Sequence, residues 1–166
     1  KSFMTKVPLP LGVMGMTVRS ADPDASLGWE FNTPIPGPKH RIWLFADNDD
    51  RTPDFEVQLN DKRYLFQKEQ RVKFQQLPYY ELEFDGSVSS MNIRLLADTA
   101  STDSTRFTFY GVDFKKPVKG GLVYHSLGVG AAPIESVLRL SVMPKQAKVL
   151  KPDIIFLDFG TNNILY

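Results

Sequence analysis

The chain of 166 residues contains no cysteine, which excludes disulfide bonds and a thiol nucleophile. It also has no apolar run of membrane-spanning length and no basic stripe interleaved with aromatic residues, so neither a membrane span nor nucleic-acid binding is expected. His40 and His125 are the only histidines, so any imidazole base inside this chain must be one of them. The net charge of +1 points to no particular class of partner.

The chain has enough hydrophobic residues, 42%, to bury a core. Short segments with alternating or β-rich character recur between turn signals; they span residues 12–19, 40–46, 55–59, 63–67, 79–84, 91–96 and 106–114. Many short strands at such spacing predict an antiparallel β-sandwich, like a jelly roll, over residues 9–114, after a connecting segment at 1–8. Asn60-Asp61 is a plausible hairpin turn, and no helix is expected before residue 133.

Residues 115–166 have a different pattern, that of a partial α/β unit. A hydrophobic strand at 122–124 leads into a glycine-rich turn, and Pro133 fits the first turn of a helix that should end before Pro144. A return loop, 145–152, then precedes a second strand, 153–158, which we expect to be buried and parallel to the first. The fold class predicted for the whole chain is therefore mixed, with a β-sandwich followed by a strand-helix-strand unit.

Two segments carry a resemblance to a known family. Tyr124-His-Ser-Leu-Gly-Val-Gly-Ala-Ala132 and Asp153-Ile-Ile-Phe-Leu-Asp-Phe-Gly-Thr-Asn162 resemble the second and third sequence blocks of the SGNH (GDSL-like) hydrolases, in the variant of the bacterial peptidoglycan O-acetylesterases. The segment from Pro8 to Ser20 resembles the start of the carbohydrate-binding-like module that those enzymes carry as an insertion. The resemblance is specific only at the two C-terminal blocks.

The resemblance implies an oxyanion hole. Its donors would be the backbone N–H of Gly130, or of Ala131 if the register differs by one, and the side-chain amide of Asn162. Asn163 stands where many members of the family have an acidic residue. The Gly-Asp-Ser block with the nucleophile and the Asp-x-x-His block with the base do not occur in the sequence, so we expect other segments of the same enzyme to supply them.

Three functions remain open on these residues. The resemblance implies first an O-acetylesterase without cofactor or metal, acting on O-acetylated peptidoglycan or another glycan in the periplasm or cell envelope. The second is an acetyltransferase of similar fold, in which a carbohydrate hydroxyl replaces water. The third is a carbohydrate-binding module without catalysis, which leaves Gly160-Thr161-Asn162 unexplained.

An internal catalytic triad of Ser126, His125 and Asp153 or Asp158 can also be drawn. It is disfavoured because neighbouring residues on a strand point to opposite faces, so His125 cannot readily activate Ser126.

Sugar-stacking rings and a metal loop are two further hypotheses. Trp29, Trp43 and Tyr80, together with Tyr79, are the candidate rings for stacking on sugars from the outside of the sandwich, although aromatic residues more often pack in sandwich cores. The acidic loop 47–50, with Asp54, has oxygen ligands that suit a hard cation. A solvated turn with side-chain-to-backbone hydrogen bonds is the stronger interpretation of that loop, and no metal site is predicted.

Overall fold

A computed structural model describes residues 9–15, 17–74, 77–96, 105–115, 123, 125 and 140–156. The described residues form strands β1 (Val18–Ser20), β2 (Ser26–Ile35), β3 (Lys39–Ala46), β4 (Phe55–Leu59), β5 (Lys62–Phe66), β6 (Tyr80–Asp85), β7 (Val88–Leu95) and β8 (Phe107–Lys115), a 3₁₀ helix η1 (Gln70–Phe74) and a helix α1 (Met143–Leu150).

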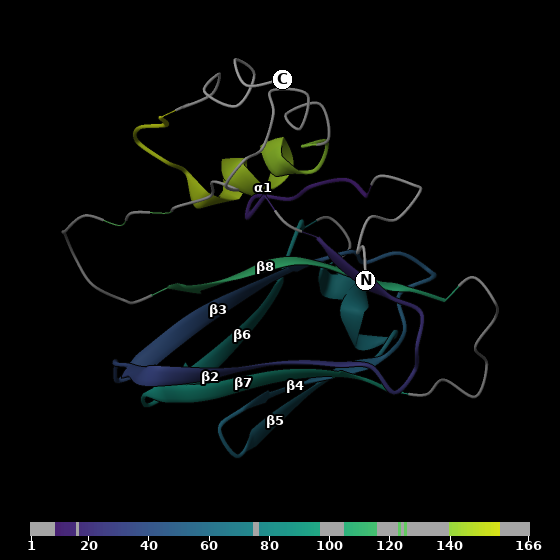
Figure 1. Ribbon diagram of the computed structural model, residues 1–166, viewed down its shortest axis with the longest axis horizontal. Coiled ribbons are helices and arrows are strands. Elements are labelled where there is room, and N and C mark those ends of the chain that lie inside the picture. Colours follow the sequence, from purple (N-terminus) through teal and green to yellow (C-terminus); the bar gives the residue numbers. More distant parts are fainter. Residues whose placement is uncertain are drawn as a thin grey trace, which may run out of the picture.

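The strands form two four-stranded sheets that pack face to face (Figure 1). Sheet A has the strand order β1-β8-β3-β6, and sheet B has the order β2-β7-β4-β5. Every recorded pairing is antiparallel. The antiparallel β-sandwich predicted from the alternating segments is therefore confirmed.

The strand boundaries differ from the prediction mainly at the N-terminal end. Among the described residues of the expected strand 12–19, only Val18 and Arg19 belong to a sheet, as part of β1, whereas the ten-residue β2 was not predicted. The hairpin at Asn60-Asp61 is confirmed, and Asn60 adopts a φ of 49°, a left-handed conformation that Asn tolerates better than most residues.

The main core lies between the two sheets and follows the period of two. Ile42 and Leu44 of β3 face Val57 of β4 and Ile93 of β7, and all four are at most 2% exposed. Aromatic rings fill the end of this core next to η1. There Phe55 stacks on Phe66 at 4.9 Å between ring centroids, and the edge of Tyr80 meets Phe55 at 5.1 Å.

A second hydrophobic cluster covers the side of sheet A that faces away from sheet B. Phe45, Tyr110 and Val13 form its buried part, and Val142, Ala147 and Leu150 at α1 pack against it. In Figure 1, α1 accordingly lies beside β8 on the side opposite sheet B. The part of sheet A around Phe45 and Tyr110 is thus covered on both faces, which explains why β3 has bulky residues at successive positions.

One buried hydrogen bond ties the start of the sandwich to α1. The Val13 N–H donates to the Gln146 Oε1 at 2.6 Å, and the Gln146 side chain is buried. Gly12 is required beside it, because a Cβ at this position would come within 2.5 Å of the Tyr110 Cβ. The segment 12–15 is therefore clamped between β8 and α1.

The predicted helix boundaries near Pro144 were wrong. Residues 140–142 are not helical, and Pro144 lies in the first turn of α1, which continues to Leu150 through the segment expected to be a loop. The first turn of a helix has free N–H groups, so a proline fits there as well as after a helix end. The predicted helix residues 133–139 lie outside the described residues.

The described part of the buried strand predicted at 153–158 is neither part of a sheet nor buried. Residues 153–156 form no strand, and Ile154, Ile155 and Phe156 are 71%, 59% and 86% exposed. A parallel strand needs a neighbour to complete its hydrogen bonds, and no described residue pairs with this segment. In the described part of the chain, no helix has the length and hydrophobicity to cross a membrane.

Candidate functional site

The proposed oxyanion donors cannot be placed. Gly130, Ala131 and Asn162 lie outside the described residues, as do Ser126 and Asp158 of the alternative triad. His125 and Asp153 are described, but neither belongs to a helix or strand. The candidate site must therefore be sought on the sandwich.

Trp29, on β2, points toward the inside of the sandwich. It is partly buried against the main core, and its ring lies 5.6 Å from that of Phe109 at an angle of 50°. A ring held between the sheets contributes mainly to packing.

Trp43 lies on the covered side of sheet A, against the second cluster. Its ring stacks on Tyr79 at 4.6 Å, and the Lys115 ammonium lies 4.6 Å from the ring centroid. The indole N–H donates to the Glu81 Oε2 at 2.7 Å. Trp43 is only partly buried, but Tyr79 and the Lys115 ammonium already engage its ring.

Tyr80 does not face outward, because its side chain is fully buried in the core. Its hydroxyl donates to the Asp47 carbonyl at 2.9 Å, and burial raises the pKa of Tyr80 to about 12. The expectation that Tyr80 points outward to meet a sugar is therefore wrong. Side chains alternate between the two faces of a strand, so Tyr80 lies on the buried face of β6 together with Leu82 and Phe84.

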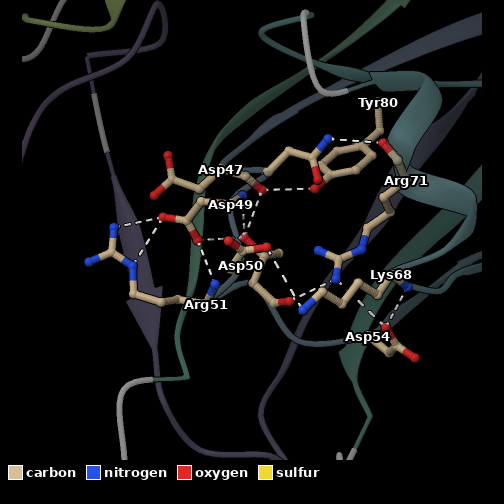
Figure 2. A network of polar contacts seen from close by, with 10 residues as sticks. Asp47, Asp49, Asp50, Arg51, Asp54, Lys68, Arg71 and Tyr80 are labelled. Carbon is tan, nitrogen blue, oxygen red and sulfur yellow. Dashed lines mark hydrogen bonds and ion pairs between the residues drawn. The ribbon is translucent and has the colours of Figure 1, made fainter. Parts of the chain in front are cut away.

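The acidic loop is a hydrogen-bonded turn (Figure 2). The Asp49 carboxylate accepts hydrogen bonds from the Arg51 backbone and side chain and from the Thr52 hydroxyl. Burial acts to raise the pKa of Asp49, but these hydrogen bonds and the Arg51 charge outweigh it and lower the pKa. Asp54 accepts from the Lys68 N–H at 2.8 Å. The turn with side-chain-to-backbone bonds is therefore confirmed.

Besides Tyr80, two further buried groups anchor this loop to the sandwich. Arg71 of η1 is 2% exposed, and its Nη2 donates to the Thr52 carbonyl at 2.8 Å (Figure 2). The Tyr110 hydroxyl donates to the Asp47 Oδ1 at 2.8 Å, and burial followed by this carboxylate raises the pKa of Tyr110. Among the described residues, no group of three or more His, Cys, Asp or Glu side chains could hold a metal ion. The hydrogen bonds from Arg71 and Tyr110 therefore hold the acidic loop in place.

The outer face of sheet B has the opposite character to that of sheet A. In β2, β7 and β4 the apolar residues point to the core, and the alternate positions carry small, amide or charged groups. This face is formed by Ser26, Gly28, Glu30, Glu56, Gln58, Arg63, Leu65, Ser90, Asn92 and Arg94. It includes two carboxylates and two guanidinium groups, which balance in charge.

The pairing register arranges this face in rows across the strands. Gly28, Asn92 and Gln58 are direct partners on β2, β7 and β4, and Arg63 continues the row on β5. Neighbouring strands lie about 4.8 Å apart, so the amide groups of one row are spaced at a regular distance.

An open hollow lies over the middle of this face. Its lining residues are Ser26, Gly28, Trp29, Glu30, Gln58, Asn60, Ser90, Met91 and Asn92. Gly28 leaves the space open, because it has no side chain between Ser26 and Glu30.

The rim of the hollow is held rigidly by Asn60. The Asn60 Oδ1 accepts from the backbone N–H groups of Ser89 and Ser90, and its Nδ2 donates to the Ser87 carbonyl. The Gln58 Nε2 in turn donates to the Asn60 carbonyl at 2.8 Å, and this bond does not use the Gln58 Oε1.

Among the residues that line the hollow, Asn92 has a side-chain oxygen without a hydrogen-bond donor in the described part of the chain. Its Oδ1 is buried, and no described residue donates a hydrogen bond to it. A buried carbonyl without a donor typically costs about 1–3 kcal/mol. Sequence reasoning missed this face because β2 was not predicted. The alternation of Ser26, Gly28 and Glu30 with Leu27, Trp29 and Phe31 was the available signal.

Comparison with known proteins gave no relatives. No family model matches the chain, and neither the search of curated proteins nor the search of solved structures found a similar protein.

Proposed function

We propose that residues 9–114 are a glycan-binding β-sandwich module and that the chain is part of an SGNH-type carbohydrate O-acetylesterase. The observation that carries the binding role is the outer face of sheet B, where amide and hydroxyl groups surround an open hollow. Neutral sugars offer many hydroxyl groups and no charge, which suits a face whose own charges balance. The balance also disfavours a polyanionic ligand.

The esterase part of the proposal rests on the two sequence blocks. In this role, the N–H of Gly130 or Ala131 and the amide of Asn162 stabilise the oxyanion, and a serine and histidine from other segments perform acyl transfer. The partial α/β unit belongs to this proposal. The exposed Ile154, Ile155 and Phe156 are consistent with it, because a neighbouring strand or helix from such segments would bury them.

Binding of the 166-residue chain to insoluble peptidoglycan, with and without O-acetyl groups, tests the binding role. We expect the chain to sediment with at least one of these polymers and to be released by a soluble oligosaccharide. A chain that stays in the supernatant with both polymers would refute the binding role.

Acetate release from an acetylated ester tests the catalytic role. The 166-residue chain should release none, because it lacks the nucleophile block, whereas a longer form with the serine and histidine segments should be active. In that form, Asn162→Ala should lower kcat by about 10²–10³-fold, since one oxyanion donor is lost. Turnover by the isolated chain that Ser126→Ala abolishes would instead establish the internal triad.

A further inference from the structure

We infer that Gly28 and Asn92 form the floor of a sugar-binding subsite on the outer face of sheet B, which takes one unit of a neutral oligosaccharide. This inference rests on the proposed binding role and specifies its site. Two independent features of the face lead to it.

The first feature is the glycine. Glycine in a strand interior weakens the strand, so its presence usually has a local reason, such as a positive φ or a close backbone approach. Gly28 has neither, because its φ lies outside the left-handed region and an added Cβ would meet nothing closer than the Asn92 Oδ1 at 3.6 Å. The fold would accept a side chain here. The lack of a side chain at position 28 is therefore explained by a ligand that occupies the hollow.

The second feature is the Asn92 amide. Its Oδ1 lies against Gly28 and has no donor among the described residues. Rotation of the amide into the open space above Gly28 would bring this oxygen to a ligand. A sugar hydroxyl or acetamido N–H would then supply the missing donor, and the amide nitrogen would donate to a ring or hydroxyl oxygen.

Neighbouring groups extend the same chemistry. Gln58 lies next to Asn92 in the same row with its nitrogen fixed by Asn60, so its oxygen is a preorganised acceptor. Glu30 and Ser90 are direct partners at the next position along the strands and line the same hollow. The two oxygens of a carboxylate can each accept a hydroxyl hydrogen of a sugar, whereas the negative charge would repel an anionic ligand.

The experiment measures binding of soluble chitin and cellulose oligomers to the full chain by titration calorimetry. These two ligands differ at C2, where chitin has an acetamido group in place of the hydroxyl group of cellulose, so they distinguish the two possible donors. Heparin serves as the polyanionic control. We expect the wild-type chain to bind at least one of the neutral oligomers and to bind heparin less tightly.

Two variants test the floor of the subsite. Gly28→Val fills the hollow with a residue that favours strands, so the melting temperature should stay equal or rise while affinity falls at least about tenfold. Asn92→Ala removes the amide and should weaken binding by about tenfold, the effect of one or two neutral hydrogen bonds. Arg41→Ala, an exposed change on sheet A, is the matched control and should bind like the wild type.

The outcomes separate the two proposals. Wild-type affinity in both Gly28→Val and Asn92→Ala would overturn the subsite and leave the binding role intact. If Gly28→Val lowers the melting temperature, Asn92→Ala alone decides the subsite. Loss of binding in Arg41→Ala with retention in Asn92→Ala would move the site to sheet A. Failure of the wild-type chain to bind either oligomer, or binding of heparin alone, would refute the subsite and the neutral-glycan role together.

Discussion

Removal of the Tyr80 hydroxyl tests how the acidic loop is anchored to the core. Tyr80→Phe keeps the ring that contacts Phe55 and Phe66 and deletes the hydroxyl, which donates to the Asp47 carbonyl and also interacts with the buried Arg71 guanidinium. That carbonyl still has the Thr52 hydroxyl at 3.2 Å, whose one hydrogen it shares with the Asp49 carboxylate at 3.3 Å, so it is not left wholly unsatisfied. We therefore expect the free energy of unfolding to fall by about 1 kcal/mol, the typical value for one hydrogen bond, and not by the larger cost of an orphaned acceptor.

Tyr64→Phe is the matched control. The Tyr64 hydroxyl also donates to a backbone carbonyl, that of Glu83 at 2.7 Å, but this bond is exposed. Water can replace the lost donor there, so the expected loss is below about 0.5 kcal/mol. Urea unfolding at neutral pH measures both variants, and a change in midpoint without a change in slope identifies a stability effect. Equal losses in the two variants would contradict the argument from burial.

Tyr80→Phe should also change how stability depends on pH in the alkaline range. The Tyr80 pKa is raised from 10.0 to about 12 in the folded chain, so the folded state holds its proton where the unfolded state releases it. Stability is therefore complete below pH 10 and falls as the pH rises toward 12, with a maximum slope of about 1.4 kcal/mol per pH unit for one tyrosine. Tyr110, whose pKa is also raised, adds to this decline. Tyr80→Phe should make the decline shallower, and an unchanged slope would refute the assigned pKa shift.

Three further substitutions test the packing on each side of the sandwich, and urea unfolding measures all of them. Gly12→Ala should cost about 1–3 kcal/mol, because the new Cβ would overlap with Tyr110, and a neutral effect would mean that segment 12–15 does not pack there. Gln146→Leu should cost about 1–3 kcal/mol by leaving the buried Val13 N–H without an acceptor, whereas the exposed Lys145→Ala should be neutral. Trp29→Ala should cost about 2 kcal/mol or more, and wild-type stability with lost glycan binding would instead make Trp29 a ligand residue.

Most strands of the sandwich could be predicted because their sequences alternate or are rich in β-forming residues. The alternation in residues 55–59, 91–96 and 106–114 has a period of two, and the bounds of β4, β7 and β8 agree with these ranges to within three residues. β2 was missed because its inward residues, such as Leu27 and Phe31, are interrupted by Gly28 and followed by Pro34. These residues lower the strand signal, and only the partner β7 makes the extended conformation favourable.

The C-terminal predictions failed where a local signal has two valid interpretations. Proline marks both the end of one helix and the first turn of the next, so Pro144 alone could not decide which side is helical. The apolar run at 154–156 likewise predicts burial, but burial depends on a neighbour that local sequence does not specify. The site on sheet B had no motif at all, since its residues come from three strands and meet only through the pairing register.

The two outer faces of the sandwich differ, because one packs against α1 and the other carries the proposed glycan site. Sheet A is covered by segment 12–15 and α1, whereas the hollow lies on sheet B, so the thickness of two sheets, about 10 Å between their planes, separates the hollow from α1 (Figure 1). A glycan bound at Asn92 would therefore be held at a distance from the C-terminal segment. In a longer, active form, Asn92→Ala should then raise the KM for polymeric substrate and leave kcat and small-ester turnover unchanged, because remote binding retains the polymer without touching the reacting group. Steady-state kinetics on O-acetylated polymer and on a soluble acetyl ester measure this. A fall in kcat on both substrates would show that the outer face of sheet B communicates directly with the catalytic centre, against the arrangement of the two faces.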